Sequence, residues 1–162
     1  HVFPHGLPEE FTLVFTLLLK KKSLRENIYL FQISDKQGYP QLSLDLNGPE
    51  STLALRAGSA DGSGVPVGCV FDGEVVQSLL DLSWHKVALS VQKRAASLHV
   101  DCGTIETHPL EPRGAVPTTG HTLLALRARD ATPVEMDIQQ VMVYCDPSLA
   151  IQEACCEIPG AR

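Results

Sequence analysis

Apolar and polar residues alternate with a period of two along most of this chain, and no other feature constrains the fold as strongly. In the range 11–19 every odd position holds Phe or Leu, whereas two of the even positions hold Thr. Successive side chains of a strand point to opposite faces, so this pattern predicts a half-buried β-strand. The same alternation recurs in the ranges 29–34, 41–46, 51–58, 86–91, 98–102, 121–128 and 137–145.

These short segments are bounded by Gly, Pro, Asn or Asp, which predicts an antiparallel β-sandwich or jelly roll. In the range 137–145 the alternation slips by one residue, which predicts a β-bulge near Gln139 and Gln140. One helix is expected, because Asp146 suits an N-cap and Pro147 the first helical position, so that residues 148–154 form two turns. Trp84 is expected in the core.

The chain has 162 residues, which suggests a single domain over 1–158, with 159–162 beginning a linker. Its abrupt opening suggests a piece of a longer protein. No apolar run approaches the roughly 20 residues needed to span a bilayer, so no membrane segment is expected. The net charge of −6 argues against nucleic-acid binding. Lys20, Lys21, Lys22 and Arg25 form the one basic cluster, either a solvated loop or a weak site for an anionic polymer such as a glycosaminoglycan.

The chain carries five cysteines: Cys69, Cys102, Cys145, Cys155 and Cys156. Their spacing lacks the paired knuckles of a zinc site, whereas cysteines spread over predicted strands favour disulfides in an oxidising compartment. The two adjacent cysteines are expected to bridge to different places, since a bond between neighbours is strained. With an odd count, one cysteine has its partner outside this fragment, pairs with another chain, or stays free.

No constellation for catalysis, nucleotide binding or cofactor binding is present, so no enzyme, catalytic residue, cofactor or resident metal is expected. His99 and Asp101 are separated by one residue in a predicted strand. Two interpretations stay open for this pair: two ligands of a metal, or, more in keeping with the pattern, a solvent-facing pair without one.

The segments "LSWHKVALSV", "SLHVDCG" and "DIQQVMVYCDPSLAIQEACC", together with "FPHGLPEEFTLVFTLLLKK", resemble the thrombospondin-N-terminal-like (laminin-G-like) domain of fibril-associated collagens. The resemblance covers about residues 3–158. It implies an all-β, laminin-G-like jelly-roll sandwich of two antiparallel sheets, with one short C-terminal helix.

The resemblance also implies a disulfide pattern. Cys102 is expected to pair with Cys155 or Cys156, and Cys69, which is additional to the family's usual four, with whichever of the two remains. Cys145 is expected to pair with a cysteine before Phe3, which this chain does not contain.

The expected function is that of a non-enzymatic, secreted module of the extracellular matrix, mediating matrix and cell-surface interactions. The implied partners are matrix proteins, other collagens, integrins or heparan sulfate, with no nucleic acid and no membrane. The implied assembly is a homotrimer through a downstream triple helix, the domain itself being monomeric. The alternative is a lectin-like or glycosaminoglycan-binding domain with a small-ligand or metal site.

Overall fold

The structure is a computed structural model that describes residues 7–61, 64–101, 103–116, 120–128, 130 and 132–150. Within these residues, ten strands and three short helical segments follow one another. They are β1 (Phe11–Leu19), η1 (Ser23–Arg25), β2 (Asn27–Ser34), β3 (Pro40–Asn47), β4 (Thr52–Ala57), β5 (Val67–Phe71), α1 (Glu74–Leu79), β6 (Trp84–Val91), β7 (Ala95–Val100), β8 (Thr104–Pro109), β9 (His121–Arg127), β10 (Met136–Tyr144) and η2 (Pro147–Leu149).

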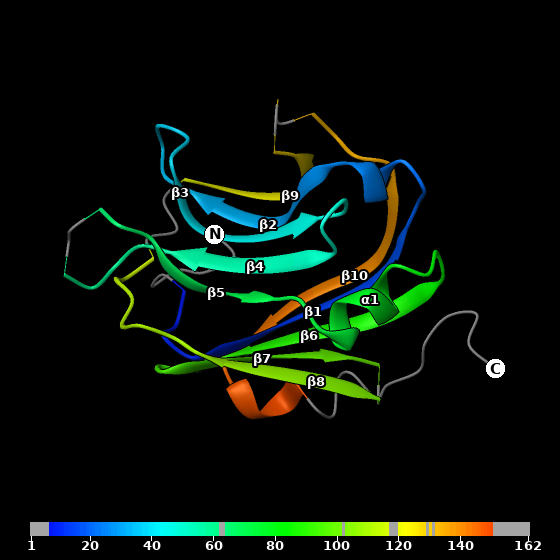
Figure 1. Cartoon of the computed structure of the whole chain (residues 1–162). Coiled ribbons are helices and arrows are strands. Elements are labelled where there is room, and N and C mark those ends of the chain that lie inside the picture. Colours follow the sequence, from blue (N-terminus) through cyan, green and yellow to red (C-terminus); the bar gives the residue numbers. More distant parts are fainter. Residues whose placement is uncertain are drawn as a thin grey trace.

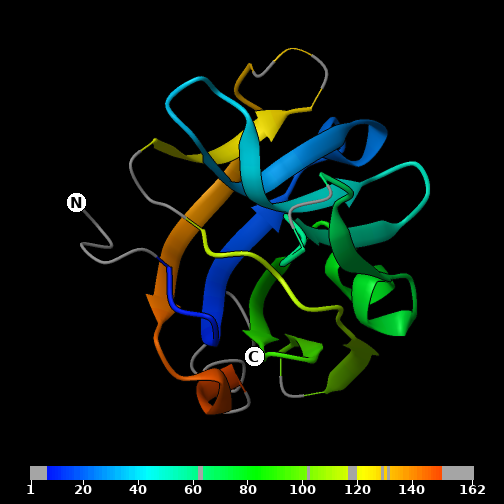
Figure 2. The same cartoon turned by 90° about the vertical axis from the view of Figure 1, so that its left-hand side faces the viewer.

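The strands form two antiparallel sheets that lie face to face (Figure 1). One, the β1 sheet, has the order β10-β1-β6-β7-β8, and the other, the β3 sheet, has the order β5-β4-β3-β2-β9. Both sheets are curved, as the view turned by 90° shows (Figure 2). The all-β sandwich expected from the alternation is confirmed.

The core lies between the sheets and is built from one parity of each strand. In β1 the odd positions are at most 1% exposed, and Phe15 meets Phe31 of the opposite sheet edge-to-face, with ring centroids 6.4 Å apart. In β3, Leu42, Leu44 and Leu46 all enter the same core cluster. The intervening residues of β3 are polar, so the other face of that sheet carries hydrogen-bonding and charged side chains.

Two β-bulges decide which side chains face outward. Thr16 pairs with Gln140 but Leu17 pairs with Ile138, so Gln139 is the extra residue, and the bulge predicted there is confirmed. In β2 a second register shift separates Tyr29 from Phe31. Plain alternation would have placed these two side chains on one face; instead Leu30 and Phe31 are both buried, and Tyr29 turns to the outer face beside Asp45.

The segment after β10 packs on the outer face of the β1 sheet, where it is seen in orange beneath the strands (Figure 1). The Asp146 carboxylate accepts from the Ser148 amide at 2.8 Å, so the predicted N-cap is confirmed. The described part of the helix is the turn η2, and residues 151–154 lie outside the described residues. Ala150 is buried against Val14 and Ala88, so η2 covers the middle of this sheet.

Two expectations from the sequence were wrong: that the domain has a single helix, and that Trp84 lies in the core. The short helix α1 was not anticipated, because its six residues are too few to show a helical period. It depends on a distant residue instead: the Glu106 carboxylate of β8 accepts from the amides of Asp72 and Gly73, at 3.1 and 2.8 Å, just before the helix begins. Trp84 is only partly buried and lies outside the core cluster, because its register partner in β1 is Leu18, which points away from the core.

A buried histidine ties the end of the β6–β7 hairpin to the loop that follows α1. His85 has a side chain only 7% exposed, with Nδ1 at 2.8 Å from the Asp101 carboxylate and Nε2 at 2.5 Å from the Asp81 carboxylate. Both ring nitrogens therefore have acceptors, which only the imidazolium satisfies by donating twice. Burial opposes protonation, but the hydrogen bonds and charges of Asp81 and Asp101 outweigh it and raise the pKa of His85.

We predict that His85 stabilises the fold more at low than at high pH. A pKa raised by folding gives a contribution that is complete below the unfolded value of about 6.5 and is lost as the pH rises through the folded value. The variant His85→Gln should lose about 1–3 kcal/mol of unfolding free energy near pH 6, and less near pH 9. Urea denaturation of both proteins across this range measures the difference, and a difference independent of pH would contradict the imidazolium assignment.

Candidate functional site

The predicted basic cluster lies where β1 ends and β2 begins. Lys20 pairs with Asp137 at 3.6 Å and Lys22 with Glu135 at 3.4 Å, and all four side chains are well exposed. Lys21 is exposed and Arg25 is at the end of η1. The fold thus brings the four basic residues together but places two carboxylates of the β9–β10 segment among them. Those carboxylates weaken the field that an anionic polymer would meet.

The structure tests little of the predicted disulfide pattern. Cys69, in β5, is partly buried, and Cys145, just after β10, is exposed; neither forms a disulfide with another described residue. Cys102, Cys155 and Cys156 lie outside the described residues, so the pairing stays a prediction. Burial, with the negative charge of Glu106 adding to it, raises the pKa of the Cys69 thiol to about 11.

The structure separates His99 from Asp101. His99 is 6% exposed on the outer side of β7, and burial lowers its pKa, so the expectation of a solvent-facing pair was wrong for this residue. The Asp101 carboxylate is held by His85 and by the amide of Lys86. Within the part of the chain that the structure describes, no group of three His, Cys, Asp or Glu side chains is arranged to hold a metal.

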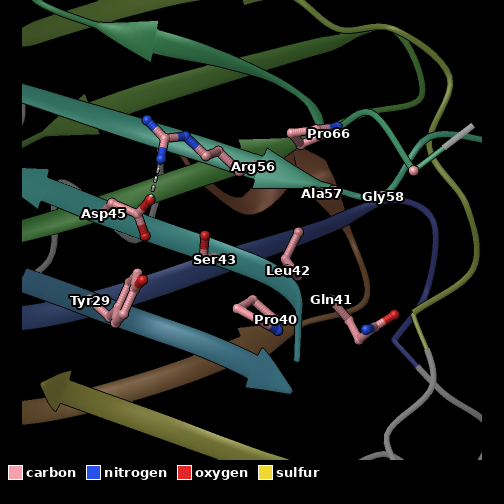
Figure 3. Close-up of a pocket in the computed structure, with 11 residues that line it drawn as sticks. Tyr29, Pro40, Gln41, Leu42, Ser43, Asp45, Arg56, Ala57, Gly58 and Pro66 are labelled. Atoms are coloured by element: carbon pink, nitrogen blue, oxygen red, sulfur yellow. Dashed lines mark ion pairs between the residues drawn. The ribbon is translucent and has the colours of Figure 1, made fainter. Parts of the chain in front are cut away.

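A pocket of about 320 Å³ opens on the outer face of the β3 sheet, away from the core. Cross-strand register builds it: Tyr29 of β2 lies opposite Asp45 of β3, and Ser43 lies opposite Arg56 of β4. Figure 3 shows these four side chains on one face of the sheet, with Gln41 and Leu42 near the strand end. Aromatic, acidic, basic and hydroxyl groups therefore line one concave surface.

Asp45 is the unusual group of this pocket. Its Oδ2 atom is 3.4 Å from Nη1 of Arg56, but its Oδ1 atom is buried and receives no hydrogen bond from any group in the described chain. Burial raises the pKa of Asp45, against the smaller lowering effects of Ser43 and Arg56. A buried acceptor without a donor costs stability.

Sequence reasoning did not find this pocket. Asp45 is one of several polar residues that alternate with leucines in β3, and nothing near it marks a motif. The bulge at Leu30 leaves Tyr29 on the same face as Asp45. The residues around Leu30 are apolar at both parities, so the sequence gives no sign of that bulge.

Comparison with curated proteins shows homology to collagens. The human collagen alpha-1(XVI) chain is 52% identical over 157 residues, 97% of this chain but 10% of that protein. The human alpha-1(XXI) chain is 33% identical over 99% of this chain and 16% of its own length, and human alpha-1(XIX) is 31% identical over 99% and 14%. The chain thus spans about a tenth to a sixth of these relatives. No protein-family model matches it.

Comparison with solved structures supports the fold. Domains LG4-5 of the mouse laminin alpha1 chain align over 85% of this chain and 38% of theirs, with a TM-score of 0.57 and 12% identity. A carbohydrate-binding module of a Ruminococcus gnavus sialidase aligns over 91% and 84%, with a TM-score of 0.63 and 12% identity. These TM-scores show a shared laminin-G-like jelly roll, and at 12% identity they show nothing about ligands. Among the described residues, no helix is long and apolar enough to cross a membrane.

We predict that Cys69 and Cys145 differ sharply in reactivity. With a pKa of about 11, only about one Cys69 thiol in a thousand is ionised near pH 8, and the thiolate is the nucleophile. Iodoacetamide should therefore modify the exposed Cys145 at least about tenfold faster in the folded domain. Peptide mass spectrometry at timed intervals measures both rates. Equal rates would contradict the prediction, and protection of Cys69 that survives unfolding without reductant would reveal its predicted disulfide.

Proposed function

Because the chain is homologous to the N-terminal region of the fibril-associated collagens, we propose that it is the N-terminal globular domain of such a collagen and a non-enzymatic interaction module of the extracellular matrix. The observation that carries this proposal is identity of 52% over 97% of the chain, since identity at that level extends to surface positions as well as to the core. The homology indicates a matrix collagen domain, and the particular role in the matrix is the proposed part.

The fold supports this role because it leaves a polar sheet face uncovered. The outer face of the β3 sheet is uncovered around its pocket, whereas η2 packs on the outer face of the β1 sheet. In the proposed parent molecule, a secreted homotrimer joined by a downstream triple helix, three copies of the domain act together. Matrix proteins, other collagens, integrins and heparan sulfate are the partner classes that we propose.

We expect the domain to promote incorporation of the parent collagen into the matrix. Cells expressing the parent collagen with and without residues 1–158 should secrete equal amounts of trimer, but the deleted form should be retained at least about threefold less in the deposited matrix, because each trimer loses three attachment sites. Quantitative immunoblots of medium and matrix measure the ratio, with trimer assembly checked on non-reducing gels. Equal retention of the two forms would contradict the proposal.

For heparan sulfate we propose a weak, salt-sensitive contact through Lys20, Lys21, Lys22 and Arg25. Exposed ion pairs contribute little to stability, so neutralising their acidic partners leaves the fold intact while freeing the lysines. The variant Glu135→Gln/Asp137→Asn should elute from a heparin column at higher salt than the unmodified domain, which should elute near or below physiological salt.

The matched control is Glu111→Gln, which removes one exposed negative charge in the segment after β8. Its elution should shift less than that of Asp137→Asn, which also removes one charge. Equal shifts would show a general charge effect and contradict a local site, and retention of the unmodified domain far above physiological salt would contradict weak binding.

A further inference from the structure

We propose that the pocket on the outer face of the β3 sheet binds a neutral sugar unit, held by Asp45, Arg56 and Tyr29. This goes beyond the role as a matrix module, because it assigns a ligand class and a site to one face of the domain. The proposal rests on the shape of the pocket, on the carboxylate of Asp45 and on the opposite charges that flank the pocket.

The shape comes from residue sizes set by the cross-strand register. Ser43 and Ala57, each 5% exposed, line the pocket together with Gly58 and Gly64, and all four are small residues. The larger Tyr29 and Arg56 side chains stand on either side of Ser43 (Figure 3). A volume of about 320 Å³ is at the lower end of the range for small-ligand sites, which suits one or two sugar rings rather than a protein side-chain cluster.

The carboxylate supplies the specific chemistry. Oδ1 of Asp45 lacks a donor in the described chain, while the Arg56 guanidinium, with 61% of its side chain exposed, has further N–H groups to donate. Two adjacent hydroxyls of a sugar match this pair, since one donates to the carboxylate and the other accepts from the guanidinium. The hydrogen bond to a charged acceptor is the stronger kind, and the ligand forms it at Oδ2, because Oδ1 is shielded from solvent.

The two charges select against charged ligands. A cation that approaches Asp45 meets the guanidinium of Arg56 3.4 Å from the same carboxylate, and an anion that approaches Arg56 meets Asp45. A ligand that is neutral and rich in hydroxyls meets neither repulsion. Tyr29, partly exposed and directly opposite Asp45, presents an aromatic face on which the C–H face of a sugar ring packs.

The test is a titration of the isotope-labelled domain, followed by amide chemical shifts, with methyl glycosides of glucose, galactose, mannose, N-acetylglucosamine and xylose and with their neutral disaccharides. We expect at least one neutral sugar to shift the amides of residues 43–45 and 54–57 saturably. A lysine methyl ester and a heparin disaccharide serve as the cationic and anionic probes and should leave these amides unshifted. Absence of saturable shifts with every neutral sugar, or shifts with a charged probe alone, would overturn the proposal.

Variants separate binding from folding. Asp45→Asn should lower sugar affinity at least tenfold and leave thermal stability unchanged or raised, because an amide is less costly to bury than a carboxylate. Tyr29→Phe should retain binding, whereas Tyr29→Leu should weaken it at least fivefold. Asp137→Asn, which removes a carboxylate from the other sheet, is the matched control and should bind as the unmodified domain does.

Unchanged affinity in a folded Asp45→Asn variant would overturn the assignment. These measurements on the isolated domain are independent of matrix incorporation, so failure of the sugar site and failure of the proposed matrix role are distinguishable.

Discussion

The rest of the structure depends on burial of β1 from both sides. One face of this strand faces the core between the sheets, and the other lies under η2, where Val14 and Ala88 meet Ala150. Eight of its nine residues are buried, which explains why its even positions depart from strict polarity. Because β1 pairs with both β6 and β10, it joins the last strand of the chain to the middle of the fold. The Thr12 hydroxyl donates to the carbonyl of Asp146 at 2.6 Å and Ser90 to that of Pro147 at 2.7 Å, so polar residues of this outer face hold η2 in place.

The two sheets consequently differ in what their outer faces are free to do. The outer face of the β1 sheet is covered in its middle by η2 and contributes stability there, whereas the outer face of the β3 sheet keeps polar residues in a concave surface. Retaining a buried, incompletely paired carboxylate at Asp45 costs more folding free energy than an amide would. Such a cost is tolerable only because the core of this domain is large, and it is typical of groups placed for binding rather than for packing.

Sequence reasoning succeeded where the information was local. Alternation predicted the strands and the sandwich. The slip of phase in β10 predicted the bulge at Gln139, since Ile138 and the pair Val141 and Val143 fall on opposite parities. It missed the bulge at Leu30, because the residues around it are apolar at both parities and no slip is visible. It missed α1 because the support for that helix comes from Glu106, more than thirty residues away. It missed the pocket because Asp45 becomes unusual only when the register sets Tyr29 and Arg56 around it, and register is a property of the fold.

Weak sites suit a domain of this kind. In the proposed sugar site, one carboxylate, one guanidinium and one ring form few contacts with the ligand. In the proposed heparan sulfate site, two carboxylates pair with the lysines and weaken the attraction. In the proposed homotrimer, three such domains are tethered to one stalk, so the second and third contacts occur at a high effective concentration. Affinity for a matrix surface that repeats its ligands then far exceeds affinity for the same ligand in solution. A domain tuned in this way would distinguish an assembled matrix from its soluble components without needing a tight site for either.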